Sequence, residues 1–75
     1  MIQILNSYYM GCTDTSYVLY KSDIAIGYYS SVKGLVEGMI RDCTLCKIKL
    51  GELRSFGEVM KYQEDLYREI IEWEF

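Results

Sequence analysis

The chain of 75 residues contains no proline and no histidine, and it has no long apolar run. Without histidine, a general base near neutral pH would have to be a carboxylate, lysine or thiol with a strongly shifted pKa, so we do not expect an enzyme. No apolar run approaches the ~20 residues of a membrane span. The first ten residues lack the basic region and the small-residue cleavage site of a signal peptide. These absences predict a cytoplasmic protein without a membrane segment.

The charge is slightly acidic and unevenly distributed. The formal net charge is −3 and the pI is near 4.8. Residues 1–54 carry a net charge of +1, whereas residues 55–75 carry −4. An acidic field repels nucleic-acid backbones, so direct nucleic-acid binding is not expected. The acidic C-terminal segment is either a solvated helix face or a surface that meets a basic partner.

The composition is that of one small globular domain covering residues 1–75. Hydrophobic residues make up 51% of the chain and aromatic residues 15%. A domain of this size buries only roughly 60% of its unfolded surface and is marginally stable, so it gains from a partner. We expect a homodimer, formed through an open sheet face or through the C-terminal helix, with Tyr29 or Leu66 meeting its copy.

Three segments have the pattern of β-strands. Residues 2–10 alternate between two faces, residues 17–21 are β-branched and aromatic, and residues 24–29 form a third apolar segment. Turn-forming residues separate the first two segments, and Ser22-Asp23 separates the last two. Short connections favour hairpins, so a three-stranded antiparallel meander is predicted.

Two helices should follow the strands. Ser30 or Ser31 is a suitable N-cap for a first helix, in which Gly34 and Gly38 fall on one side and permit close packing. Its apolar stripe comprises Val32, Leu35, Val36, Met39 and Ile40. A second helix begins at a capping box, and its stripe comprises Phe56, Val59, Met60, Gln63, Leu66, Tyr67, Ile70 and Ile71. The predicted fold is α+β, with the order βββαα and both helices on one sheet face.

Tyrosine doublets occur in two of the predicted strands. Successive strand residues point to opposite faces, so each doublet places one ring inward and one outward. If Ile4, Ile24 and Ile26 face the helices, Tyr8 and Tyr28 join them in the core, whereas Tyr9 and Tyr29 lie on the uncovered face together with Tyr17 or Tyr20. Exposed tyrosines are typical of protein interfaces. They could also stack on a nucleobase with Lys21 or Lys33 nearby, or simply tile a two-sided sheet.

Cys43 and Cys46 form a CxxC pair, and Cys12 is the third cysteine. A structural zinc site needs four ligands, which three cysteines could supply only with a carboxylate or a second subunit. A redox CxxC opens a helix after a strand, whereas this pair falls near a helix end. We therefore predict no bound metal, no cofactor and no disulfide required for folding.

Three segments carry a resemblance to known proteins. ILNSYY (Ile4–Tyr9), YVLYK (Tyr17–Lys21) and IGYYSSVKGLVEGMI (Ile26–Ile40) resemble a set of small, largely uncharacterised bacteriophage proteins. The chain differs from that set in the short Ser22-Asp23 connection, where the set has a lysine-rich one, and in the segment Cys43–Cys46. The resemblance supplies no catalytic residue. It implies a viral protein in the host cytoplasm that occupies a host defence protein, such as a CRISPR-Cas nuclease, in the manner of an anti-CRISPR inhibitor.

The predicted function is therefore stoichiometric inhibition through an acidic helix and a tyrosine-rich sheet face. The predicted partner-binding residues are Tyr9, Tyr20, Tyr29, Glu58, Asp65, Glu69, Glu72 and Trp73. The alternatives are a sponge that sequesters a nucleotide immune signal and a structural or assembly protein.

Overall fold

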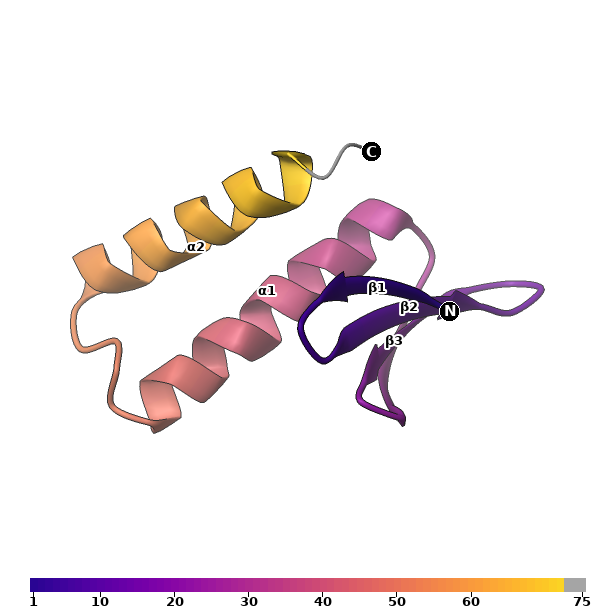
Figure 1. Ribbon diagram of the computed structural model, residues 1–75, viewed down its shortest axis with the longest axis horizontal. Helices are drawn as coiled ribbons and strands as arrows, with labels where there is room; N and C mark the ends of the chain where they lie inside the picture. The colour runs from indigo at the N-terminus through magenta and orange to yellow at the C-terminus, as the bar shows by residue number, and fades with distance from the viewer. Residues whose placement is uncertain (73–75) are drawn as a thin grey trace. The chain divides into compact units, whose positions relative to one another are not determined.

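The structure, a computed structural model, describes the backbone of residues 1–72 and the side chains of residues 1–70. It contains four strands, β1 (Ile2–Leu5), β2 (Tyr8–Cys12), β3 (Tyr17–Lys21) and β4 (Ile24–Tyr29), followed by helices α1 (Val32–Lys49) and α2 (Phe56–Glu72) (Figure 1). The α+β class and the antiparallel sheet are confirmed. The chain divides into two compact units, Met1–Met39 and Ile40–Phe75, and the boundary falls within α1.

The first unit holds a four-stranded meander in the order β1-β2-β3-β4. The prediction of three strands was wrong, because the expected strand 2–10 is folded back on itself. Asn6 has a positive φ of 29° and turns the chain with Ser7 into β2. Asparagine tolerates this conformation better than most residues, so Asn6-Ser7 is a turn rather than part of a strand. Ser22, with φ 58°, makes the corresponding turn between β3 and β4.

Both edge strands of the sheet are irregular. The pairing of β1 with β2 shifts between Gln3 and Leu5. The pairing of β3 with β4 shifts between Leu19 and Tyr20, which pair with Gly27 and Ala25, so Ile26 is an extra residue. Such bulges twist an edge strand and hinder the addition of a further strand. The edges of this sheet are therefore poor templates for strand pairing.

The beginning of α1 packs against the sheet within the first unit. Ser31 accepts a hydrogen bond at its Oγ from the Gly34 amide (3.1 Å), which identifies it as the N-cap. Leu35 and Met39 are fully buried, as is Leu19 of β3. These side chains form the core of the unit, and the predicted stripe of the first helix is confirmed there. That α2 also covers this sheet face stays a prediction.

Gly38 allows β4 to approach α1 closely. A Cβ added at Gly38 would lie 2.1 Å from the Tyr29 hydroxyl oxygen, well inside van der Waals contact. The Tyr29 ring therefore occupies the space that a side chain at position 38 would take. This close packing compensates for the poor helix propensity of glycine.

We expect Gly38→Ala to destabilise the protein, although alanine normally favours a helix by about 1 kcal/mol over glycine. The added methyl group would displace the Tyr29 ring. In a Tyr29→Ala background the same change should be stabilising, because the obstacle is gone. Urea denaturation of the four proteins of this double-mutant cycle measures the reversal of sign. A Gly38→Ala change that stabilises both backgrounds would contradict the packing described.

The second unit is a helical hairpin. Helix α1 ends at Lys49 and is followed by Gly51, which has a φ of 77°. The Gly51 amide donates to the Ile48 carbonyl and the Glu52 amide donates to the Lys47 carbonyl, both at 3.0 Å. This bonding pattern is a Schellman cap. It ends the helix well beyond Ile40, the last residue of the predicted apolar stripe. Helix α2 begins at the predicted N-cap, because the Glu58 amide donates to Ser55 Oγ (3.2 Å). The other bond of the predicted capping box differs: the Glu58 carboxylate accepts from the amide of Arg54 (2.9 Å), the residue before the N-cap.

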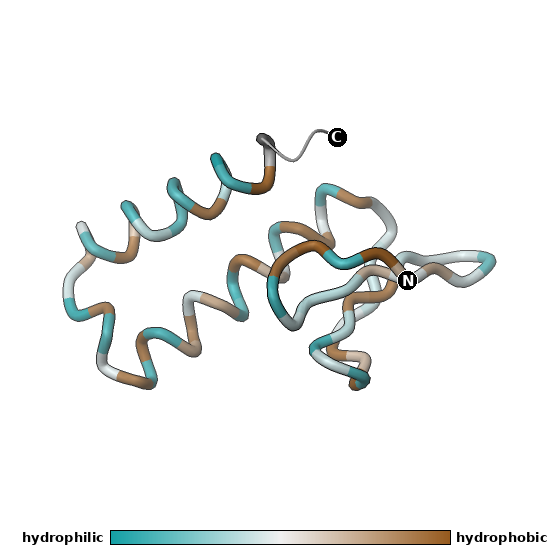
Figure 2. The backbone as a smooth tube through the Cα atoms, in the orientation of Figure 1, coloured by the Kyte–Doolittle hydropathy of each residue, from teal (hydrophilic) through white to brown (hydrophobic). Residues whose placement is uncertain are grey.

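A polar contact joins the two helices of the hairpin. The Thr44 hydroxyl is buried and donates to the Ile40 carbonyl (2.7 Å), while Gln63 Nε2 donates to Thr44 Oγ1 (3.1 Å). The apolar stretches of α2 recur once per turn on one side, as the colours of Figure 2 show. Among the residues of the apolar stripe predicted for this helix, Ile70 is buried, whereas Phe56, Met60 and Tyr67 are exposed.

Candidate functional site

The strand register gathers three tyrosines on one face of the sheet. Tyr9 of β2 lies directly opposite Tyr20 of β3, and Tyr28 of β4 lies opposite Val18. Residues paired across antiparallel strands share a face, and residues two apart on one strand do so as well. Tyr9, Tyr20 and Tyr28 are therefore on one surface, which we call the open sheet face. The beginning of α1 covers the opposite face, where Tyr29 packs on Gly38.

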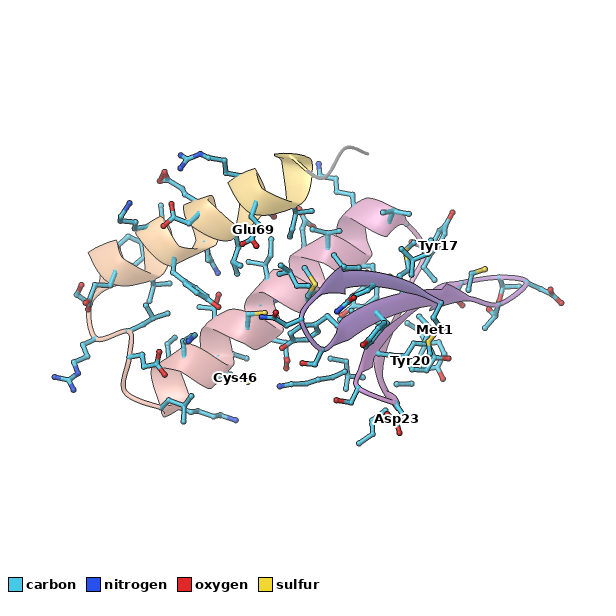
Figure 3. The ribbon with its side chains drawn as sticks, in the orientation of Figure 1. Met1, Tyr17, Tyr20, Asp23, Cys46 and Glu69 are labelled. Atoms are coloured by element: carbon cyan, nitrogen blue, oxygen red, sulfur yellow. The ribbon has the colours of Figure 1, made fainter. Side chains whose placement is uncertain are left out.

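Gly11 holds the Tyr20 ring in place on the open sheet face. A Cβ at Gly11 would be 3.0 Å from Tyr20 Cε2 and 3.6 Å from Met1 Cγ. Both side chains thus lie over the bare backbone of Gly11, and Figure 3 shows Met1 and Tyr20 close together. A hollow of about 400 Å³ opens here, where β2 extends past the start of β1. It is lined by Met1, Ile2, Met10, Gly11, Cys12, Tyr17 and Tyr20.

The strands place no charged side chain on the open sheet face. The four strands contain a single charged residue, Lys21, and the register pairs it with Tyr8. Its ammonium group lies 5.5 Å from the centre of the Tyr8 ring, a cation–π contact. Tyr8 neighbours Tyr9 and so points to the opposite face, where it is buried. The prediction of a cation beside the exposed rings therefore fails for Lys21.

The orientation predicted for β4 was wrong. Tyr28 is 67% exposed, whereas Tyr29 is half-buried against α1, so the two rings have exchanged their expected places. Ile24 and Ile26 are exposed rather than in the core. The bulge at Ile26 changes the alternation of faces for the residues that follow it, which explains the exchange of Tyr28 and Tyr29. It does not explain Ile24, which precedes the bulge and pairs with Lys21. For Tyr8 and Tyr9 the expected placement is correct, and Tyr20 rather than Tyr17 joins Tyr9.

The acidic residues predicted to bind a partner are partly engaged within α2. The Glu58 carboxylate accepts a hydrogen bond from the Arg54 amide. Asp65 lies 3.8 Å from Lys61 Nζ and 3.5 Å from Arg68 Nη1, so its charge is locally balanced. Glu69 is exposed and forms no ion pair among the described residues.

Two of the predicted partner-binding residues lie partly or wholly outside the described residues. The backbone of Glu72 belongs to α2, and its side chain lies outside the described residues. Trp73 also lies outside them. Within the described residues, the acidic surface of α2 consists of Glu58, Glu64, Asp65 and Glu69.

The cysteines of α1 lie beside a tyrosine of α2. Burial is the main cause that raises the pKa of Tyr62 above its ordinary value of 10.0, and the neighbouring Cys43 thiol raises it further. Cys12, Cys43 and Cys46 are not joined in a disulfide. Within residues 1–70, no three His, Cys, Asp or Glu side chains are grouped so that they could hold a metal ion. About one helical turn after Cys43, a hydrogen bond from Lys47 to Glu52 (2.9 Å) raises the pKa of Lys47.

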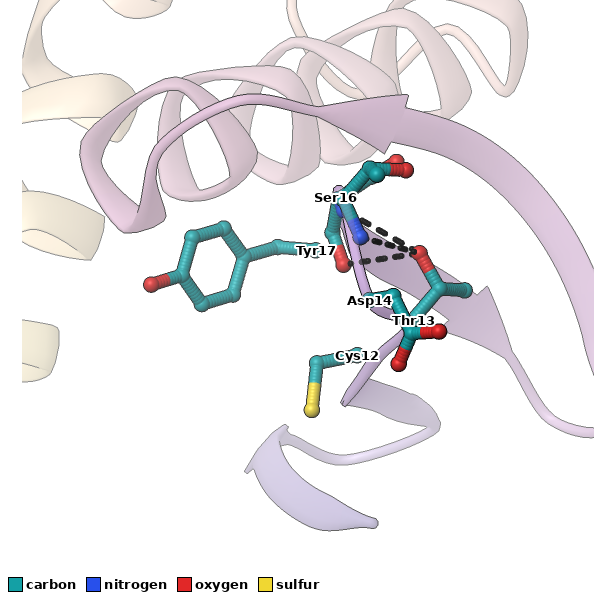
Figure 4. A pocket seen from close by; sticks show the side chains of 6 residues that line it. Cys12, Thr13, Asp14, Ser16 and Tyr17 are labelled. Atoms are coloured by element: carbon teal, nitrogen blue, oxygen red, sulfur yellow. Dashed lines mark hydrogen bonds between the residues drawn. The ribbon is translucent and has the colours of Figure 1, made fainter.

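The turn between β2 and β3 forms a second hollow, of about 280 Å³, lined by Cys12–Tyr17. Thr13 organises this turn, because its Oγ1 accepts hydrogen bonds from the amides of Thr15 (3.3 Å) and Ser16 (3.0 Å) (Figure 4). The polar groups that line the hollow are thus used to hold the turn itself. This arrangement is structural, and we assign it no ligand.

Comparison of the chain with protein-family models, with curated proteins and with solved structures yields no match. None of the helices within the described residues is both long enough and apolar enough to cross a membrane.

Proposed function

We propose that the protein is a non-enzymatic binding module whose open sheet face anchors a protein partner. The observation that carries this proposal is the cross-strand pair Tyr9–Tyr20, with Tyr28 on the same uncharged surface. Tyrosine is enriched at interface hot spots because one rigid ring supplies both a large apolar area and a hydroxyl group. Three such rings on an antiparallel sheet form a rigid surface that needs little ordering when it binds.

Two further observations favour this surface over the other surfaces of the first unit. Bulges at β1 and β4 hinder strand addition at the edges of the sheet, which leaves its face as the accessible part. The Tyr20 ring is already positioned over Gly11, so a partner meets it in a fixed place. The lack of charge on this face fits an apolar and hydrogen-bonding protein surface better than a phosphate-bearing nucleotide, which usually requires nearby cations.

For the identity of the partner, the proposal follows the resemblance to small bacteriophage proteins. The protein would act in the host cytoplasm as an anti-defence inhibitor that occupies a defence protein, such as a CRISPR-Cas nuclease, one copy to one. The exposed carboxylates of α2, Glu69 foremost, would raise the rate of association with a basic target, while the tyrosines would supply the affinity.

Capture from host lysate tests this proposal. Immobilised protein should retain a defence protein, and the same bait carrying Tyr9→Ala and Tyr28→Ala should not. Ile24→Ala is the matched control, because Ile24 is as exposed as Tyr28 and lies on the same strand, but pairs with Lys21. A thermal-shift screen with cyclic nucleotides is run in parallel. A shift with a nucleotide and no retained protein would instead support the signal sponge.

A further inference from the structure

A second apolar surface lies on the helical hairpin. Its exposed members are Leu45, Ile48, Met60 and Tyr67, which are 39–48% exposed. Leu45 and Ile48 belong to α1, and Met60 and Tyr67 belong to α2. They form one surface only if their angular positions around the two helices place them on the same side of the hairpin.

Helical geometry places these four side chains on one side of the hairpin. The bond between Thr44 and Gln63 marks where the helices face each other. At about 100° per residue, Leu45 and Ile48 are rotated from Thr44 in the same sense as Met60 and Tyr67 from Gln63. In an antiparallel pair of right-handed helices the same sense leads to the same side. Cys43 and Tyr62, rotated in the opposite sense, do lie beside each other.

The apolar side of the hairpin also carries two opposite charges. Arg41 of α1 and Glu64 of α2 are rotated in the same sense as the apolar residues, and both are exposed. Neither forms an ion pair with a described residue. The Thr44–Gln63 bond fixes the register, so Ile48 is level with Val59 and Met60, and Arg41 and Glu64 lie within about 3 Å of one level.

We propose that this side of the hairpin binds a second copy of the chain and forms a four-helix bundle. A two-fold axis parallel to the helices sets α1 of one copy against α2 of the other in antiparallel orientation. Ile48 then meets Met60 of the second copy, and Arg41 meets its Glu64. Apolar side chains thus meet apolar side chains and opposite charges meet each other, so the surface is complementary to itself. Leu66, by contrast, is half-buried on the side of α2 that faces α1, so it is not at this interface.

Such a dimer would also offset the small size of the chain. A 75-residue domain has a limited core, and oligomerisation is one way to bury additional apolar surface. The bundle uses residues of Ile40–Phe75 only, and the open sheet face belongs to Met1–Met39. The dimer surface and the open sheet face are therefore formed by separate sets of residues, and they can be tested separately.

Sedimentation equilibrium of the full chain tests the proposal. The wild type should have twice the chain mass of 8.8 kDa, and Ile48→Lys should have the mass of one chain. Ile24→Lys is the control, because it places the same charge at an exposed isoleucine of β4 and should leave the dimer intact. Circular dichroism establishes that each variant is folded.

A charge exchange makes the test independent of the apolar substitution. Arg41→Glu sets like charges against each other twice per dimer and should raise the dimer dissociation constant about tenfold or more. Combining it with Glu64→Arg should restore the dimer. A wild type with the mass of one chain would overturn the proposal. So would an intact dimer in both Ile48→Lys and Arg41→Glu, or a dissociated dimer in Ile24→Lys.

Discussion

Leu35→Ala should lower the free energy of unfolding of the protein by about 2–5 kcal/mol. Leu35 is fully buried where α1 meets the sheet, and removing a buried leucine side chain costs about 2–5 kcal/mol, including the cavity left behind. Natural domains are stable by roughly 0.05–0.15 kcal/mol per residue, which gives about 4–11 kcal/mol for 75 residues. The substitution therefore removes a large part of the total stability.

Leu50→Ala provides a matched control for this prediction. It deletes the same atoms at a site that is 71% exposed, so stability should change by less than about 0.5 kcal/mol. Urea denaturation followed by circular dichroism measures both variants. Equal effects of the two substitutions would mean that Leu35 is not a core residue.

Tyr20→Ala should weaken binding of the captured partner by about 30-fold or more, which corresponds to the roughly 2 kcal/mol that defines an interface hot spot. Tyr20 is expected to show the largest effect of the three tyrosines, because it stands between Tyr9 and Tyr28 on the central strand β3. Its ring is also held over Gly11 in the free protein, so little ordering opposes binding.

Two variants separate this effect from a loss of folding. Tyr20→Phe keeps the ring over Gly11 and should retain most of the affinity, with a smaller loss from the missing hydroxyl. Gly11→Val leaves the tyrosine unchanged but displaces its ring, and should weaken binding nearly as much as Tyr20→Ala. Isothermal titration calorimetry with the captured partner compares them. A Gly11→Val variant of normal affinity would show that the position of the Tyr20 ring is unimportant.

Much of the fold could be predicted because local signals agreed with the packing. The capping box at Ser55 and Glu58 marks the start of α2, and the Gly34 and Gly38 spacing indicates a close approach. The end of α1 was harder to predict, because Thr44 replaces an apolar core residue. Its hydroxyl satisfies the Ile40 carbonyl and accepts from Gln63, so a polar residue is buried without an apolar signal. Gly51 was the residue in the sequence that could have indicated the end of α1, because glycine readily adopts the positive φ found after a helix.

The errors in the candidate site come from single residues that change the strand alternation. Asn6 looks like part of a strand, but its positive φ starts a turn. Ile26 is inserted as a bulge, and this one residue exchanges the expected places of Tyr28 and Tyr29. A period of two cannot reveal a bulge, because the extra residue has the same chemistry as its neighbours. Tyr9 precedes the bulge and lies on the open sheet face as expected, and the register shows that Tyr20 rather than Tyr17 lies opposite it.

The salt dependence of partner affinity, compared between two sets of variants, tests the central claim most directly. One set is Tyr20→Ala and Tyr28→Ala on the uncharged sheet face, and the other is Glu69→Lys on α2. Charges act over about 8 Å at 0.15 M salt and less at higher ionic strength. We predict that the tyrosine variants lose the same affinity at low and high salt, whereas the charge variant loses affinity mainly at low salt. Full affinity in both tyrosine variants, with binding abolished at all salt concentrations by Glu69→Lys, would contradict the account.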